Sequence, residues 1–168
     1  MWKFPLQLLI ILFVLHMHFD GCLSGQNLAD PRNQKPGGPG VEQGESYARD
    51  FSETAAVLKG AVEDTTWLFS TNPTDLQQTL SKYFTGPLLE QLIKNTEAFT
   101  QKATDWSYQT VLEEYAIDIE GEQARAVALV REDDPISKES HFTELHFQML
   151  RTGQGWRITA LSNTLSNN

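Results

Sequence analysis

The chain has 168 residues, of which 40% are hydrophobic and 21% are charged, so it can form one compact domain with appendages but not two enzymatic domains. Its net charge of −9 and its lack of a basic cluster argue against nucleic acid as a partner, because few cations are present to displace counterions from phosphates. A single cysteine excludes an intramolecular disulfide and a multi-cysteine metal or iron–sulfur site.

The first 22 residues have the features of a secretory signal. Lys3 and the amino terminus form a short positive region, Leu6–Leu15 is apolar except for Gln7, and polar residues follow. A helix that spans a bilayer needs about 20 apolar residues, so this shorter segment fits a signal peptide better than a permanent span. An uncleaved anchor over Phe4–Phe19 is the alternative.

Cys22 directly follows Gly21 at the end of this apolar segment. The order Phe19-Asp20-Gly21-Cys22 resembles the signal of bacterial lipoproteins, in which an apolar residue and two small residues precede the modified cysteine. The resemblance implies lipid attachment at Cys22 and an extracytoplasmic, membrane-anchored protein. The alternative is cleavage after Ser24 or Gly25, which would discard Cys22 and release a soluble secreted protein. Either outcome leaves no free thiol, which suits an oxidising compartment.

A flexible tether is predicted after the signal. Residues 23–45 are rich in Gly, Pro, Asn and Gln and show no hydrophobic periodicity, so they cannot bury enough apolar surface to offset the entropy of ordering. A flexible chain of this length spans about 25 Å on average. The folded domain is expected over residues 46–162, and residues 163–168 form a short tail.

Three helices should open the folded domain. Ser46 can cap a long amphipathic helix whose apolar residues recur at steps of three and four, and which should end before Asn72-Pro73. A short second helix should run from a cap at Thr74-Asp75 to Phe84. Gly86-Pro87 should end it and begin a third helix, with the proline at the first helical position.

After Thr104 the hydrophobic pattern changes to period two, which predicts antiparallel strands. The alternation slips at Glu113-Glu114, which predicts a β-bulge, and Gly153-Gln154-Gly155 predicts a tight hairpin turn. The expected strands are Trp106–Ile119, Ala124–Arg131, Ser140–Arg151 and Trp156–Ser162. Helices followed by a meander predict the α+β class, with three N-terminal helices packed on one face of a curved four-stranded antiparallel sheet.

This order of elements resembles the nuclear transport factor 2-like fold, a cone formed by three helices and a curved sheet. Phe142–Arg151 followed by Gly155-Trp156-Arg157-Ile158 is similar to the last hairpin of that fold. A signal, a tether and then this domain look most like the extracytoplasmic subunits of bacterial conjugation and type IV secretion channels. Phe84-Thr85-Gly86 is similar to a threonine–glycine pair in the membrane proteins associated with mammalian-cell-entry transporters. Those proteins are scaffolds, so the resemblance implies a non-catalytic interaction domain.

Motifs for catalysis are missing from the sequence. It contains no phosphate-binding glycine loop, no paired-histidine metalloprotease motif and no Gly-x-Ser-x-Gly elbow, and we expect no cofactor and no metal. His141 and His146 are five residues apart on one predicted strand, so they point to opposite faces of the sheet and cannot share a metal. Glu132-Asp133-Asp134 could bind a hard cation weakly, but a solvated loop is the simpler interpretation.

A small-ligand carrier or an isomerase- or dehydratase-type enzyme is the alternative function, because enzymes with this fold use the inside of the cone. The aromatic candidates for lining such a pocket are Trp67, Tyr83, Trp106, Tyr108 and Tyr115. Core packing explains the same aromatic residues. An open pocket with a buried carboxylate or histidine beside a tyrosine would favour the ligand, whereas an interior filled by Leu, Phe and Trp would favour the scaffold.

Alternation along the third strand divides its side chains between two faces. Phe142 and every second residue after it form the more polar set, which should face outward. Leu145, Phe147 and Met149 should face the core together with Trp156, Ile158 and Ala160 of the next strand. Half-apolar exposed sheet faces tend to be covered by a partner. The predicted interface, either with another protein or between two copies of the chain, consists of Phe142, Glu144, His146 and Gln148.

Overall fold

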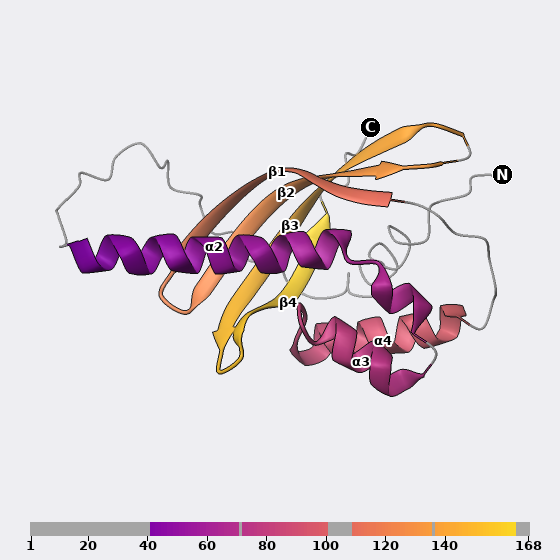
Figure 1. Cartoon of the computed structure of the whole chain (residues 1–168), viewed down its shortest axis with the longest axis horizontal. Helices are drawn as coiled ribbons and strands as arrows, with labels where there is room; N and C mark the ends of the chain where they lie inside the picture. Colours follow the sequence, from indigo (N-terminus) through magenta and orange to yellow (C-terminus); the bar gives the residue numbers. More distant parts are fainter. Residues whose placement is uncertain (1–40, 71, 101–108, 136, 164–168) are drawn as a thin grey trace, which may run out of the picture.

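The computed structural model describes residues 41–70, 72–100, 109–135 and 137–163. Helices α2 (Val41–Glu63), α3 (Pro73–Leu80) and α4 (Gly86–Thr100) precede strands β1 (Gln109–Glu120), β2 (Gln123–Asp133), β3 (Ser140–Thr152) and β4 (Gly155–Asn163) (Figure 1). The strands form one antiparallel sheet in the order β1-β2-β3-β4. This architecture confirms the predicted α+β class. The predicted signal, Cys22 and residues 23–40 of the predicted tether lie outside the described residues.

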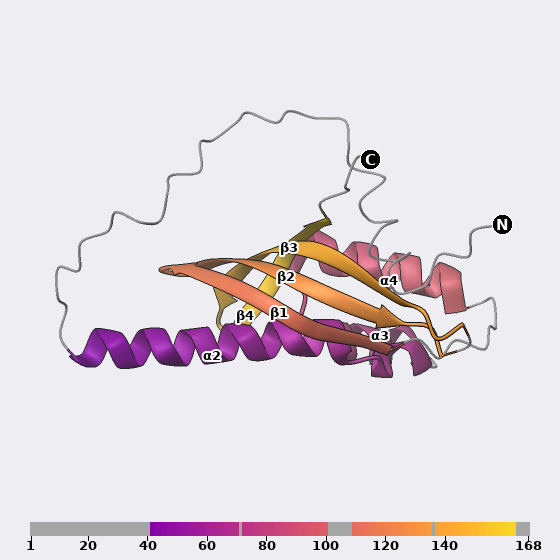
Figure 2. The ribbon, with the colours of Figure 1, turned by 90° about the horizontal axis from the view of Figure 1, so that it is seen from above.

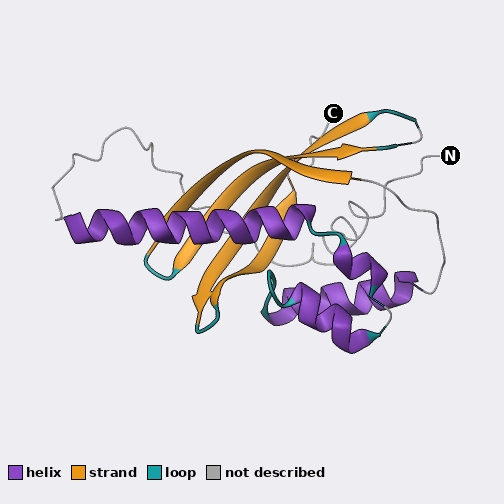
Figure 3. Ribbon diagram, in the orientation of Figure 1, coloured by secondary structure: helices purple, strands orange, loops and turns teal. Residues whose placement is uncertain are grey.

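The helices gather on one side of the sheet (Figure 3). Helix α2 lies across that side of the sheet and contacts β1 and β4 (Figures 1 and 2). Helices α3 and α4 pack on each other, and α4 packs beside β4. Between these layers, the side chains of Leu58, Leu145, Trp156 and Ile158 are at most 1% exposed. Within the described residues, no helix is both long and apolar enough to cross a membrane.

Helix α2 differs from the prediction at both ends. It begins at Val41, so Ser46 lies inside the helix and does not cap it. It ends at Glu63, well before Asn72-Pro73, because the Asp64 carboxylate accepts hydrogen bonds from the backbone N–H and the hydroxyl of Thr66. Such local side-chain bonds compete with the helical backbone pattern. A short 3₁₀ helix, Thr66–Phe69, follows.

The connection from α3 to α4 also differs from the prediction. Asn72 is the cap of α3, since its side-chain oxygen accepts a hydrogen bond from the backbone N–H of Asp75 at 2.9 Å. The helix ends at Leu80, ahead of Phe84. The chain then runs along the edge of β4, where Ile158 N–H donates to the Tyr83 carbonyl at 2.8 Å and Thr85 N–H donates to the Ile158 carbonyl at 3.0 Å.

The sheet contains two register shifts. The first, between Leu112 and Glu114 in β1, confirms the predicted bulge. The second was not predicted: Met149 pairs with Ile158 and Gln148 pairs with Ala160, so Thr159 is an extra residue in β4. The prediction for Ala160 was therefore wrong, because residues directly opposite share a face and Gln148 is exposed. Leu161, paired with Phe147, packs against the core in its place.

Candidate functional site

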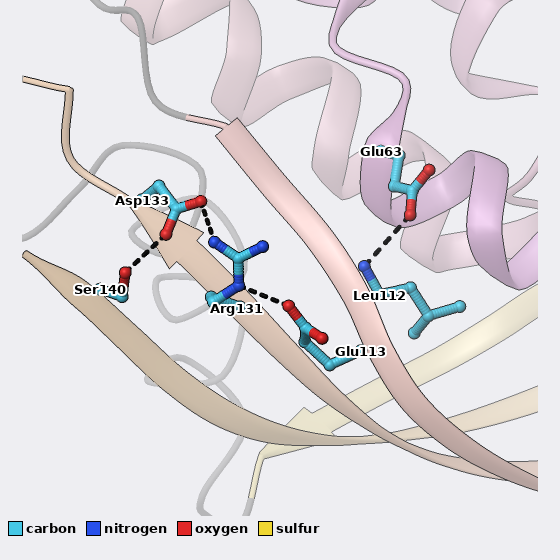
Figure 4. A network of polar contacts seen from close by, with 6 residues as sticks. All are labelled: Glu63, Leu112, Glu113, Arg131, Asp133 and Ser140. Carbon is cyan, nitrogen blue, oxygen red and sulfur yellow. Dashed lines mark hydrogen bonds and ion pairs between the residues drawn. The ribbon is translucent and has the colours of Figure 1, made fainter.

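One end of the sheet carries a group of polar and charged side chains from three strands. Here the start of β1, the end of β2 and the start of β3 meet, and we define this region, residues 109–113, 131–134 and 138–141, as the polar sheet end. Its inner face points toward the helices and carries Glu132. Its outer face carries a network of ion pairs and hydrogen bonds (Figure 4).

Glu132 is the most unusual residue of this region. It continues the buried row of β2 that begins with Ala124 and runs through Val130, and it is only 1% exposed. Neither carboxyl oxygen receives a hydrogen bond from any described residue. Burial raises the pKa of Glu132 to about 7, because the charged form is disfavoured away from water. In the sheet it lies directly opposite Thr110 of β1 and His141 of β3.

Arg131, next to Glu132, joins two strands on the outer face (Figure 4). Its guanidinium pairs with Glu113 of β1 and with Asp133 of β2, and hydrogen bonds to these two carboxylates raise the pKa of Arg131. The Ser140 hydroxyl of β3 donates to Asp133 at 2.6 Å. Hydrogen bonds from Ser140 and Arg131 lower the pKa of Asp133, so this carboxylate stays charged. The network therefore links β1, β2 and β3.

The end of α2 is attached to β1 at the same place. The Thr110 hydroxyl donates to the backbone carbonyl of Val62, one of the last carbonyls of the helix, which has no partner inside it. The backbone N–H of Leu112 donates to Glu63 Oε1 at 3.2 Å (Figure 4). Lys59 Nζ lies 3.8 Å from the other carboxylate oxygen of Glu63. Two hydrogen bonds thus hold the helix end against the edge strand.

A cavity of about 440 Å³ lies beside the outer network and is lined by Gln109, Asp133, Asp134, Pro135, Lys138, Glu139 and Ser140. Three of these lining residues are acidic and one, Lys138, is basic. Glu132 and Asp133 point to opposite faces of β2, so the acidic run does not converge on one point. Among the described residues, no group of His, Cys, Asp and Glu side chains is arranged to hold a metal ion.

The aromatic candidates for a cone pocket lie in different surroundings. Trp67 and Tyr83 are half-buried and pack against the hydrophobic core. Tyr115 is 45% exposed, and its ring centroid lies 6.4 Å from that of Phe51 on α2. Trp106 and Tyr108 lie outside the described residues.

Tyr83 lies beside a carboxylate. Its hydroxyl donates to Asp64 Oδ2 at 2.8 Å. Burial, and then the hydrogen bond to Asp64 and the charge of that residue, raise the pKa of Tyr83 to about 12, so the hydroxyl remains a donor at neutral pH. Burial alone would raise the pKa of Asp64, but hydrogen bonds from Thr66 and Tyr83 lower it overall. The pair joins the end of α2 to the segment after α3.

The predicted interface residues lie on the outer face of β3. Phe142 is 58% exposed, Glu144 and Gln148 are also exposed, and His146 is partly exposed with its Nε2 3.0 Å from Glu144 Oε1. Two neighbouring hydrophobic side chains, Leu150 at 38% and Val127 at 37%, are exposed as well. Leu129 pairs with Glu144 and Val127 pairs with His146, so Phe142, Leu129 and Val127 follow one another in a stripe across β3 and β2.

Sequence reasoning missed two charged groups that the fold buries. The acidic run predicts a solvated loop at Glu132, although the alternation from Ala124 through Val130 continues to this residue. Asp50, 7% exposed, has Arg151 Nη1 within 3.0 Å of both of its carboxylate oxygens. No local pattern links these two residues, because 101 positions separate them in the chain.

No known family model matches this sequence, and no curated protein matches it significantly. Among solved structures, the chain is similar to a nuclear transport factor 2-like protein with a cystatin-like fold from Novosphingobium aromaticivorans, with a TM-score of 0.52 and 14% identity over 76% of this chain and 89% of that one. A nuclear transport factor 2-like protein of unknown function from Pseudomonas putida is also similar, with a TM-score of 0.46 and 14% identity over 76% and 90% of the two chains. The first likeness identifies a nuclear transport factor 2-like fold and, at this identity, nothing beyond the fold.

Proposed function

We propose that this chain is a non-catalytic, extracytoplasmic, membrane-tethered interaction domain that presents the outer face of its sheet to a protein partner in a secretion or transport assembly. The observation that carries the proposal is the hydrophobic stripe on β3 and β2 formed by the exposed Phe142 and Val127 and the half-buried Leu129 between them. Contiguous exposed hydrophobic surface with polar residues around it is typical of contact sites between proteins. A second copy of the chain is one candidate partner.

The interior of the cone supports this proposal over catalysis. Trp156, Ile158, Leu145 and Leu58 fill the space between α2 and the sheet, as expected for a domain whose interior serves stability. The sequence supports the location, since the apolar segment and the Gly21-Cys22 pair are typical of an exported, lipid-anchored protein.

A photo-crosslinking amino acid at position 142 tests the interaction. In native membranes it should crosslink to one defined protein or to a second copy, and the same group at the exposed Lys82, on a different surface, should not. Phe142→Asp should remove the complex while leaving the thermal unfolding of the domain within a few degrees of wild type, because an exposed side chain contributes little to the core. An unfolded Phe142→Asp domain would contradict its assignment to the outer face.

Cys22→Ser tests the tether. Each buried CH₂ of an acyl chain adds about 0.8 kcal/mol of membrane affinity, so two chains hold a protein stably. The variant should lose its membrane association or accumulate in the unprocessed form. A variant that matures and fractionates like the wild type would exclude lipid attachment and leave the outer-face interaction to be judged on its own experiment.

Binding of a small ligand inside the cone is the second candidate function, and Glu132 favours it as a buried carboxyl group without a hydrogen-bond donor among the described residues. A thermal-shift screen on wild type and Glu132→Gln tests this function. A compound that stabilises the wild type and not the variant would support it, since a ligand that binds only the folded state stabilises that state.

A further inference from the structure

Glu132 lies in the part of the sheet where the end of α2 meets β1. It is 1% exposed on the inner face of β2, directly opposite Thr110. Thr110 and Leu112 make the hydrogen bonds that hold the end of α2 against β1, to the Val62 carbonyl and to Glu63. We call this set, Val62, Glu63, Thr110, Leu112 and Glu132, the helix-end corner.

In the part of the chain that the structure describes, the charged groups around Glu132 do not compensate a negative charge on it. The end of α2 carries Glu63, which is itself a carboxylate. The Nζ atom of Lys59 lies 3.8 Å from Glu63 Oε2. From β1, the opposite residue is the uncharged Thr110. From β3, the opposite residue is His141, whose side chain is exposed. Arg131 and Asp133 of β2 alternate with Glu132 and pair with each other on the outer face.

A buried carboxyl group without donors is stable in its neutral form and costly in its charged form. Relief of that cost requires water to reach the oxygens, and water can reach them when the helix-end corner separates. We propose that Glu132 is a proton-controlled latch: its neutral form keeps the end of α2 closed on β1 and β2, and its ionisation opens the helix-end corner. The latch is independent of the proposed interaction function.

The direction of the effect follows from linkage. Burial raises the pKa of Glu132 from 4.5 to about 7, so the closed state holds the proton more tightly than an open state in which the carboxyl group is in water. The closed state is therefore fully favoured below about pH 4.5 and loses this advantage as the pH rises through about 7. The latch is closed in mildly acidic surroundings and loosened in neutral to alkaline ones.

Hydrogen exchange of individual amides in the full chain tests the latch. The Leu112 N–H reports directly, because it donates to Glu63 across the corner. After correction for the intrinsic pH dependence of exchange, its opening in the wild type should increase roughly tenfold or more between pH 5.5 and pH 8. Glu132→Gln keeps the shape and removes the titration, so the increase should vanish. Glu120→Gln, an exposed glutamate of β1, should behave as the wild type.

Two further comparisons keep the test decisive. His141 lies directly opposite Glu132 in the sheet, so His141→Gln must retain the response. Loss of the response in that variant would assign it to His141 and overturn the latch. Glu132→Met provides a second neutral variant of similar volume if Glu132→Gln does not fold, and it should also abolish the response. Equal pH profiles in the wild type and the neutral variants overturn the proposal. The proposal is also overturned if hydrogen exchange accelerates with pH as much at the core amide of Ile158 as at that of Leu112, because that pattern indicates global destabilisation.

Discussion

Gly60 of α2 lies directly against the ring of Tyr83: a Cβ atom added to Gly60 would lie 2.3 Å from Cε1 of that ring. Glycine inside a helix is unfavourable by about 1 kcal/mol relative to alanine. Here the missing side chain lets the helix approach the segment after α3 closely enough for the Tyr83 hydroxyl to reach Asp64. The contact therefore joins the long helix to the short helices through a residue that local propensity disfavours.

Gly60→Ala should destabilise the domain by about 1–3 kcal/mol, although alanine is the better helix former, because the added methyl group displaces the Tyr83 ring. Gly44 provides the matched control, since it lies in the same helix and a Cβ added there meets nothing within 4 Å. Gly44→Ala should be neutral or stabilising by up to about 1 kcal/mol. Urea denaturation of the two variants measures both effects, and equal stabilities would contradict the close approach.

Trp156→Ala should unfold or nearly unfold the domain. The Trp156 side chain is 1% exposed under α2, and removing a buried tryptophan costs about 3–5 kcal/mol of a typical total of about 5–15 kcal/mol. Phe142→Ala, which removes an aromatic ring that is 58% exposed, should change the free energy of unfolding by less than about 1 kcal/mol. Thermal unfolding followed by circular dichroism compares the two; a near-normal transition in Trp156→Ala would require a different arrangement of helices on the sheet.

Tyr83→Phe should lower the free energy of unfolding at neutral pH by about 1 kcal/mol, because it removes the hydrogen bond to Asp64. The pKa of Tyr83 is raised from 10.0 to about 12, so its stabilising contribution is complete below pH 10 and is lost as the pH rises toward 12. The pKa of Asp64 is lowered from 3.8, so its contribution is present above that value and is lost as the pH falls further. Stability curves against pH should therefore be flatter in the variant at both extremes, and parallel curves would show that the bond contributes nothing.

The pair of Asp50 and Arg151 should be worth more than an exposed ion pair. Asp50 is 7% exposed, Arg151 Nη1 lies 3.0 Å from its carboxylate, and the guanidinium lies 6.0 Å from the centroid of the Trp156 ring. Asp50→Ala should cost about 1–3 kcal/mol, because it leaves a partly buried guanidinium without its acceptor. Lys59→Ala, which breaks an exposed pair with Glu63, should cost no more than about 1 kcal/mol. A double-mutant cycle with Arg151→Met isolates the coupling, and a coupling near zero would contradict this prediction.

The candidate site was only partly predictable. The faces of β3 followed from alternation, because a residue of a strand points to one face or the other, and Phe142 and Glu144 are exposed while Leu145 and Phe147 are buried. The burial of Glu132 was not predicted, because acidic residues are almost never fully buried without a partner and the acidic run favoured a loop. Its burial depends on neighbouring elements, which hydrophobic alternation within β2 does not describe.

The sequence by itself determined the order of helices and strands, the bulge in β1 and the turn at Gly153-Gln154, because periodicity and turn chemistry act over a few residues. The tertiary structure decided what depends on contacts between distant segments. It brought Asp50 to Arg151 across 101 positions, placed Tyr83 against Gly60 and enclosed Glu132 on the inner face. These contacts form only when the helices pack on the sheet, and the free energy of that packing overrides the local preferences of a mid-helix glycine and of an ionisable side chain.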